Sequence, residues 1–373
     1  MISGVSGHGW IGGPSAGRGG RAYIVNRQVW DMKNKVRKRI LWALGTLAVL
    51  DGLAVGAFFN MAAKRDSVFF RKKEKKKGEQ EKTEKDLWEE QVQRKRSEGT
   101  QWIQGMNCQR VQLRSRDGLL LAGYYLEAED AGRIVVMFHG WRGSWKHDFG
   151  ACLRWMYEEG ASLLLIEQRA QGESEGKYMG FGVLERWDCH AWLRWLEEKN
   201  ERRLPVYLYG VSMGAAAVLM AAGDELPGEV KGVIADCGFT SPYEMVYRFG
   251  YTNFKLPKHP LMDELNWVFK RRAGYGLKEY STLKAMEHCR VPVLLIHGTA
   301  DTFVPYEMSV QNYEACTAEK KLLLVEGAEH CESYLKDRKR YQKAVSEFLQ
   351  DTAEGGKEKG ELAGRKDRYR DDR

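Results

Sequence analysis

From residue 107 onward, short apolar runs alternate with helix-like stretches, and this alternation constrains the fold more than any other feature of the sequence. The runs are 133–140, 161–168, 204–210, 230–238, 291–298 and 321–327. Each is a continuous aliphatic or β-branched segment, which is typical of strands buried on both faces of a parallel sheet. Helical patterns such as 183–199 and 333–349 separate them. The alternation predicts an α/β domain with a doubly wound, mostly parallel sheet and right-handed crossovers.

Two features add detail to this predicted sheet. Residues 110–115 and 119–127 alternate as a strand pair does, and Asp117-Gly118 between them favours a tight turn. They are therefore expected to form an antiparallel hairpin. Residues 241–280 interrupt the strand–helix rhythm after the run 230–238.

A long apolar segment, residues 40–63, precedes the domain. It contains 24 residues without a basic side chain, and as a helix it would extend roughly 36 Å, enough to cross a bilayer. Asp51 lies in its middle and costs about 2.5–3.5 kcal/mol on insertion scales, which the apolar neighbours can offset. The segment predicts a single-pass transmembrane anchor that contacts the lipid bilayer. A cleaved signal peptide and a buried core helix are the alternatives.

The remaining segments differ from the domain in composition. Residues 1–39 are predicted to be a disordered basic tail, and Met32 resembles a natural translation start. Residues 64–100 are predicted to be a charged, solvated stalk. The folded α/β domain is expected at 101–352, and residues 353–373 are predicted to be a disordered charged tail.

Charge and cysteine spacing exclude several classes of function. The net charge is +8, but the basic excess lies in the first hundred residues and the rest of the chain is nearly neutral. A nucleic-acid-binding domain would carry that charge on its folded part, so no nucleic-acid partner is expected. The seven cysteines form no Cys-x-x-Cys pair. No phosphate-binding glycine loop or metal-ligand spacing occurs, so neither cofactor nor metal is predicted.

The pattern Gly-x-Ser-x-Gly occurs three times, at Ser15, Ser174 and Ser212. In parallel sheets, chemistry gathers beyond the carboxyl ends of strands. Only Ser212 follows a predicted strand closely and precedes a small-residue helix, as a nucleophile elbow requires. Ser15 lies in unpatterned sequence, and Ser174 leads into a loop. Ser212 is therefore the predicted nucleophile.

A serine hydroxyl needs a base, and the base needs an acid that orients it. Asp301 and His330 each follow a predicted strand, and the chain order Ser212, Asp301, His330 is the order typical of this sheet type. Asp236, at the end of another strand, is the alternative acid. The oxyanion donors are predicted to be the backbone N–H groups of Met213 and Trp141.

These motifs together resemble the serine esterase/aminopeptidase-like group of the α/β-hydrolase superfamily. The resemblance covers residues 107–350 and is carried by the motifs "FHGWRGS", "EQRAQGESEG", "GVSMGAA", "ADCGFTSP", "LLIHGTADTFVP" and "GAEH". In that group the second motif usually begins with Asp, where this chain has Glu167. The resemblance implies that Ser174 belongs to a structural loop. It also implies a cell-membrane protein whose hydrolase domain faces outward, as in membrane-anchored bacterial members.

The resemblance further implies a cap over the active site at 241–280. Its aromatic residues, including Trp267, either line an apolar acyl pocket or form the cap's own core. We predict a serine hydrolase that cleaves carboxylic ester or related acyl bonds of a small to medium substrate through an acyl-enzyme. An aminopeptidase-like amide hydrolase and a catalytically idle scaffold at the membrane are the alternatives.

Overall fold

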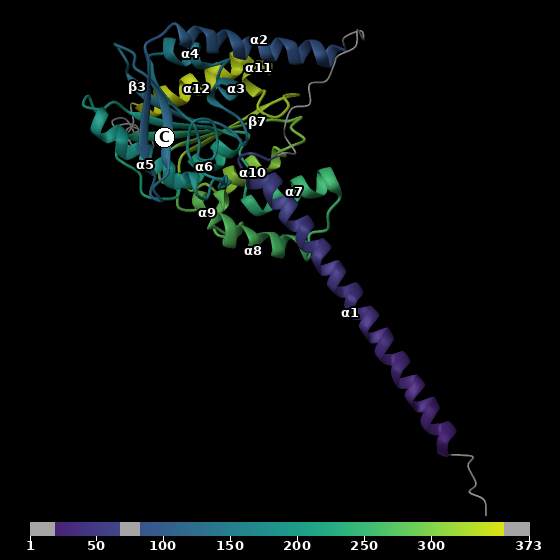
Figure 1. The fold of residues 1–373 in the computed structure, drawn as a ribbon. Coiled ribbons are helices and arrows are strands. Elements are labelled where there is room, and N and C mark those ends of the chain that lie inside the picture. The colour runs from purple at the N-terminus through teal and green to yellow at the C-terminus, as the bar shows by residue number, and fades with distance from the viewer. Residues whose placement is uncertain (1–18, 68–82, 354–373) are drawn as a thin grey trace, which may run out of the picture. The chain divides into compact units, whose positions relative to one another are not determined.

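The computed structural model describes residues 19–67 and 83–353 (Figure 1). The chain divides into two compact units, Met1–Val55 and Gly56–Arg373, and each is described by itself. The predicted disorder of residues 1–18 and 354–373 lies outside the described residues, as does Ser15.

Helix α1 (Gly19–Ala63) begins in the first unit and ends in the second. Its part Trp30–Ala63 is long and apolar enough to cross a membrane. Residues 19–39, predicted to be disordered, are helical instead. The physical reason is local, because no glycine or proline interrupts the sequence between Gly20 and Gly45.

The second unit contains an eight-stranded sheet whose spatial order is β1-β2-β4-β3-β5-β6-β7-β8 (Figure 1). The strands are β1 (Cys108–Arg114), β2 (Leu120–Leu126), β3 (Arg133–Phe138), β4 (Ala161–Ile166), β5 (Val206–Val211), β6 (Val230–Asp236), β7 (Val293–Gly298) and β8 (Lys320–Val325). Strand β2 pairs antiparallel with both β1 and β4, and all other pairs are parallel. The predicted doubly wound fold and its hairpin are confirmed.

Helices cover both faces of the sheet (Figure 1). One face packs against α2 (Glu84–Gln104), α3 (Trp145–Asp148), α4 (Leu153–Glu158), α11 (Ser333–Lys336) and α12 (Arg338–Ala353). The other packs against α5 (Glu185–Lys199), α6 (Met213–Ala222), α9 (Thr282–Met286) and α10 (Glu307–Ala315). Successive strand residues alternate between the two cores, as Val135 and Val136 do. The central strands of the sheet are therefore apolar throughout.

Two further helices, α7 (Pro242–Phe254) and α8 (Leu261–Ala273), lie between β6 and β7 in the chain. They occupy the interval predicted to be a cap. Ser241 begins α7 by accepting a hydrogen bond from the Glu244 N–H, and Gly274 ends α8 with a φ of 80°. Phe269 of α8 is fully buried, whereas Trp267 is 65% exposed.

Helix α2 differs from the solvated stalk predicted at 64–100. Thr83 and Asp86 form a capping box at its start, and Val92, Arg96, Gly99 and Ile103 are buried. A Cβ on Gly99 would lie 1.7 Å from the Gly150 carbonyl oxygen. The helix therefore packs backbone to backbone against the segment before α4. One face of residues 84–100 is thus part of the folded unit, and only the other is solvated.

Candidate active site

Ser212 lies in a sharp turn between β5 and α6. Its φ is 55° and its ψ is −114°, a conformation that L-residues rarely adopt and that the surrounding packing must hold. A Cβ on Gly214 would lie 1.9 Å from the Phe138 carbonyl oxygen, and one on Gly210 would lie 2.3 Å from the Gly214 oxygen. Both glycines are therefore required for the close approach of β3, β5 and α6. The turn lifts the Ser212 hydroxyl above the carboxyl end of the sheet.

The structure brings the three predicted residues together. His330 Nε2 lies 3.0 Å from Ser212 Oγ, and His330 Nδ1 lies 2.6 Å from Asp301 Oδ2. Asp301 follows β7 and His330 follows β8, so adjacent strands carry them to one edge of the sheet. Asp301 is 6% exposed and Ser212 is 4% exposed. The result is a continuous hydrogen-bonded chain of hydroxyl, imidazole and carboxylate.

Backbone and side-chain donors hold the Asp301 carboxylate in place. Its Oδ1 accepts the N–H groups of Phe303 and Val304 at 2.9 and 2.8 Å, and His297 Nε2 lies 3.2 Å from Oδ2. Burial raises the pKa of Asp301, but the hydrogen bonds from His297 and His330 outweigh it and hold that pKa below its usual range. The carboxylate is therefore ionised and directed at the imidazole.

The alternative acid, Asp236, faces away from His330's ring nitrogens. It accepts hydrogen bonds from Ser333 Oγ at 3.2 Å and from Tyr341 Oη at 3.0 Å. Burial raises its pKa to about 7. Asp236 is thus a buried structural acid that ties β6 to α11 and α12.

The raised pKa of Asp236 predicts a pH-dependent cost to stability. Between its usual pKa of 3.8 and its folded value of about 7, the native state retains a proton that the unfolded state has lost, so stability falls as pH rises. Because the asparagine in Asp236→Asn cannot ionise, the stability of the variant does not fall with rising pH for this reason. We expect the melting temperature of the variant, relative to that of the parent, to rise between about pH 4 and pH 7. An equal difference at both pH values would contradict the assignment.

The loop after β3 runs directly beside the serine. A Cβ on Gly140 would lie 3.2 Å from Ser212 Cβ, and the Gly140 N–H donates to Asp148 Oδ2 at 2.6 Å. Trp141, a predicted oxyanion donor, is the next residue. Met213, the other predicted donor, is the first residue of α6, where backbone N–H groups lack partners within the helix. Trp141 thus follows a residue that approaches Ser212, and Met213 follows Ser212 itself; their roles as oxyanion donors stay predictions.

His139 and Ser174 have structural partners. The Gln168 N–H donates to His139 Nε2 at 3.1 Å, so the proton of this buried imidazole is on Nδ1, which donates to the Gly140 oxygen at 2.9 Å. Ser174 Oγ accepts the Ala122 N–H at 2.8 Å and donates to the Glu167 carbonyl. Within residues 19–67 and 83–353, neither side chain forms a hydrogen bond with Ser212 or His330, so Ser174 belongs to a structural loop, as the resemblance implies.

A narrow apolar cavity opens onto the Ser212 hydroxyl. Its volume is about 20 Å³, space for about one water molecule. Its lining is Ala62, Trp141, Phe181, Ser212, Phe239, Met245, Val246, Phe249 and Phe303. The two roles considered for the cap aromatics are both present, because Phe249 lines the cavity while Phe269 packs within the cap.

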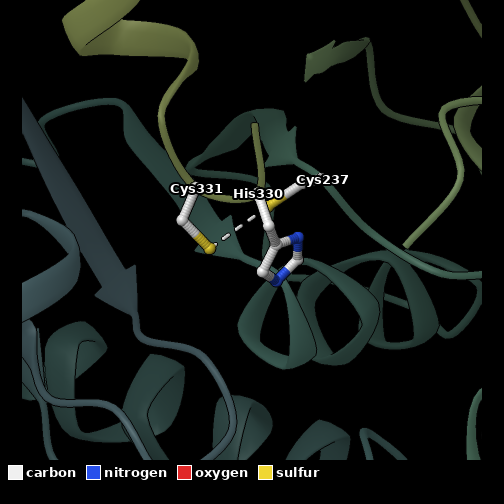
Figure 2. Close-up of side chains that lie close together, drawn as sticks. All are labelled: Cys237, His330 and Cys331. Atoms are coloured by element: carbon white, nitrogen blue, oxygen red, sulfur yellow. Dashed lines mark hydrogen bonds between the residues drawn. The ribbon is translucent and has the colours of Figure 1, made fainter. Parts of the chain in front are cut away.

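Two cysteines lie beside the histidine (Figure 2). Cys237 Sγ and Cys331 Sγ are 3.5 Å apart, and with His330 they place three possible metal ligands within 4.8 Å of one another. Both ring nitrogens of His330 already face Asp301 and Ser212. A metal bound at all three residues would therefore displace the hydrogen-bonded chain and inhibit any chemistry that depends on it.

Cys331 also affects the protonation of His330. The hydrogen bond from Cys237 lowers the pKa of Cys331 to about 6. Burial lowers the pKa of His330, but Cys331 and Asp301 outweigh it and raise that pKa well above its usual range. We expect Cys331→Ser to lower the His330 pKa and to move the acid limb of the kcat/KM–pH profile to lower pH. Cys108→Ser, distant on β1, is the control; an unmoved acid limb in Cys331→Ser would contradict this role.

Comparisons with known proteins agree with this geometry. A family model described as serine aminopeptidase, S33, matches residues 129–274, and one described as TAP-like protein matches residues 277–359. The chain belongs to the α/β-hydrolase superfamily. The resemblance stated from the motifs is therefore confirmed.

Individual relatives are distant in sequence. The chain is 28% identical to the uncharacterized protein YqkD of Bacillus subtilis, over 84% of this chain and 97% of that one. It is 22% identical to the lysophosphatidylserine lipase ABHD12 of Danio rerio, over 51% and 48% of the two chains. The esterase Pf2001 of Pyrococcus furiosus shares its fold, with a TM-score of 0.54, 23% identity, and coverage of 66% and 93%.

Proposed function

We propose that this protein is a membrane-anchored serine hydrolase that cleaves carboxylic esters of small to medium acyl groups. One observation carries the proposal: the hydrogen-bonded chain of Ser212, His330 and Asp301 ends at an apolar cavity. A nucleophile, a base and an orienting acid within hydrogen-bond distance are the parts that acyl transfer requires.

In the proposed reaction, Ser212 Oγ attacks the ester carbonyl carbon while His330 Nε2 takes the hydroxyl proton. The bond to the alcohol oxygen then breaks, and His330 returns the proton to that oxygen. Water repeats the sequence on the acyl-serine and releases the acid. Asp301 holds the imidazole with its proton on Nδ1, so that Nε2 can accept, and stabilises the imidazolium when it forms.

The oxyanion is proposed to accept hydrogen bonds from the N–H groups of Trp141 and Met213. The Asp148 carboxylate supports this arrangement, because it occupies the Gly140 N–H and fixes the loop just before Trp141. Donors that are fixed before the reaction stabilise the developing charge without reorganisation, and each is worth about 10²–10³-fold in kcat.

The apolar lining favours an ester with a hydrocarbon acyl group. Esterases have the same fold, and ABHD12 carries the name of a lipase. An amide substrate of the aminopeptidase type is the alternative within this chemistry, since the same three residues cleave amides. An idle scaffold would not need the Ser212 conformation, which costs strain energy of order 1–3 kcal/mol.

The anchor is proposed to be retained. Phe58, Phe59 and Met61 at the end of α1 are buried in the second unit, with 5%, 0% and 6% exposed. Removal of residues 40–63 as a signal peptide would strip these side chains from the folded domain. We therefore propose a single-pass protein of the cell membrane. The outward orientation proposed for its hydrolase domain rests on the resemblance to membrane-anchored bacterial members.

The test uses the full chain in detergent with p-nitrophenyl esters from acetate to decanoate, alongside fluorophosphonate labelling. The proposal expects serine-dependent turnover with a chain-length optimum, and labelling that maps to Ser212. Turnover of aminoacyl amides without ester turnover would support the amide alternative. Neither turnover nor labelling on folded protein would support the scaffold.

A further inference from the structure

The end of the anchor helix and the residues after it, 56–67, are called here the docking segment. They belong to the second unit. Within this segment Phe58, Phe59, Met61, Ala62, Ala63 and Ser67 are buried. The apolar run 40–63 ends within this segment. Its last residues therefore pack in protein.

The loop that carries a predicted oxyanion donor holds the docking segment with two consecutive side chains. Trp141 Nε1 donates to the Ala62 carbonyl at 2.8 Å. Arg142 donates to the carbonyls of Met61, Lys64 and Arg65 at 2.8, 2.7 and 3.1 Å. The last carbonyls of a helix lack partners within it, and a guanidinium there also complements the helix dipole. Arg142 thus ends α1 and ties it to this loop.

The opposite side of the docking segment is fixed by backbone contacts. Met179 N–H donates to the Ala63 oxygen at 2.9 Å, and Arg65 N–H donates to the Lys177 oxygen at 3.0 Å. The Arg65 side chain donates to the Ser174 oxygen at 2.5 Å and to the Gly172 oxygen. The segment therefore bridges the loop after β3 and the loop after β4, both of which lie at the carboxyl edge of the sheet.

Ring contacts continue from the docking segment to the catalytic histidine proposed above. Phe58 lies 6.0 Å from Phe249, and Phe249 lies 5.6 Å from Trp141, between ring centroids. Phe303 lies 6.5 Å from Phe249 and 5.0 Å from His330. A Cβ on Gly250 would lie 3.0 Å from the Phe58 ring, so α7 approaches Phe58 closely. The docking segment and the cap thus share one aromatic wall.

We propose that the docking segment is part of the active site, with Ala62 limiting the acyl length and Arg142 positioning the oxyanion loop. The inference rests on the proposed function and extends it. Ala62 lines the cavity next to Ser212, so a larger side chain at this position would occupy the side of the cavity where an acyl chain enters. Arg142 touches no reacting atom and acts through the backbone of its neighbour Trp141. The anchor is thereby a structural part of the site as well as a tether.

Ala62→Trp and the milder Ala62→Val test the length limit in the full chain. Both should retain acetate turnover, while decanoate turnover relative to acetate falls by at least about tenfold in Ala62→Trp and less in Ala62→Val. Ala57→Trp, earlier on the same helix at an exposed position, is the matched control and should keep the parent profile. If both Ala62 variants keep the parent chain-length profile while labelling normally, the inference is overturned.

Arg142→Gln tests the positioning role. We expect kcat for acetate to fall about tenfold with KM changed little, because only transition-state contacts are weakened. Arg142→Lys should recover part of kcat, since it retains the charge but not the planar fork. Arg114→Gln, which removes a bond to the Gly118 oxygen on the hairpin turn, should leave both constants unchanged. A rise in KM alone in Arg142→Gln would overturn the role.

Ser212→Ala separates the two proposals. If ester turnover persists in Ser212→Ala, the proposed function fails, whatever the Ala62 variants do. If turnover depends on Ser212 but the Ala62 and Arg142 variants behave as the parent, the proposed function stands and the role of the docking segment is refuted.

Discussion

Replacing Ser212 by alanine should abolish fluorophosphonate labelling and lower kcat for p-nitrophenyl esters by roughly 10⁴–10⁶-fold. The reason is that an alanine side chain offers His330 no hydroxyl to deprotonate, so only the oxyanion donors and substrate binding remain to accelerate attack by water. The stability of the protein should change little, because within the described part of the chain the hydroxyl forms a hydrogen bond with His330 Nε2 alone. Initial rates and labelling of the purified full chain measure the effect.

Ser174→Ala is the matched control, because it removes a serine from a second Gly-x-Ser-x-Gly sequence. Ser174 is fully buried and bonded to Ala122 and Glu167, so its loss should lower stability by about 1–3 kcal/mol. At a temperature where the variant is folded, its kcat should be unchanged. Loss of turnover in Ser174→Ala at full folding would contradict the choice of Ser212.

The strand pattern could be predicted from the sequence because its cause is local. A strand with helices on both sides has apolar residues on both faces, so β3 through β7 appear as mostly apolar runs, with Lys231 of β6 as the one exposed residue in their interiors. The candidate site followed from the same pattern. Once the strands were placed, residues just beyond their carboxyl ends, such as Asp301 and His330, were expected to meet.

The docking segment could not be predicted because its partners are distant in the chain. The sequence "FFNMAA" suits lipid or protein equally well, and only the carbonyl contacts of Arg142, about eighty residues later, distinguish the two. Helix α2 was missed for a similar reason. Its charged surface predicted solvation, and its contact with Gly150 is invisible in a local pattern.

Asp148 was also missed, although it fixes the Gly140 N–H beside Ser212. Its side chain is 5% exposed, and burial raises its pKa, but hydrogen bonding to His147 outweighs burial and keeps the pKa lowered. Helix α3 has four residues, too few for a periodic pattern. Asp148 follows Gly140 by eight residues, and no pattern in the sequence around it indicates that its carboxylate accepts the Gly140 N–H.

Replacing the predicted acid, Asp301, has the second largest expected effect on kcat, after replacement of Ser212. Asp301→Asn should lower kcat about 10⁴-fold, the loss found when the acid of another serine hydrolase triad becomes an amide. An amide N–H facing His330 Nδ1 would favour the tautomer with its proton on Nε2, which cannot accept from Ser212. Geometry would be preserved, so KM should change little, whereas the melting temperature should fall at neutral pH, because an amide only partly replaces the hydrogen bonds that hold the pKa of Asp301 below its usual range.

Asp236→Asn is the matched comparison, an isosteric change at another buried acid on the neighbouring strand. Its bonds run to Ser333 and Tyr341 and not to the imidazole, so we expect kcat to fall by less than about tenfold. Measuring both variants from about pH 6 to pH 9 separates a wrong tautomer from a shifted His330 pKa. A wrong tautomer lowers kcat at the pH-independent plateau of the profile, whereas a shifted His330 pKa moves the acid limb of the profile along the pH axis. If Asp236→Asn loses the plateau and Asp301→Asn keeps it, Asp236 is the functional acid and the hydrogen bond that Asp301 accepts from His330 is structural.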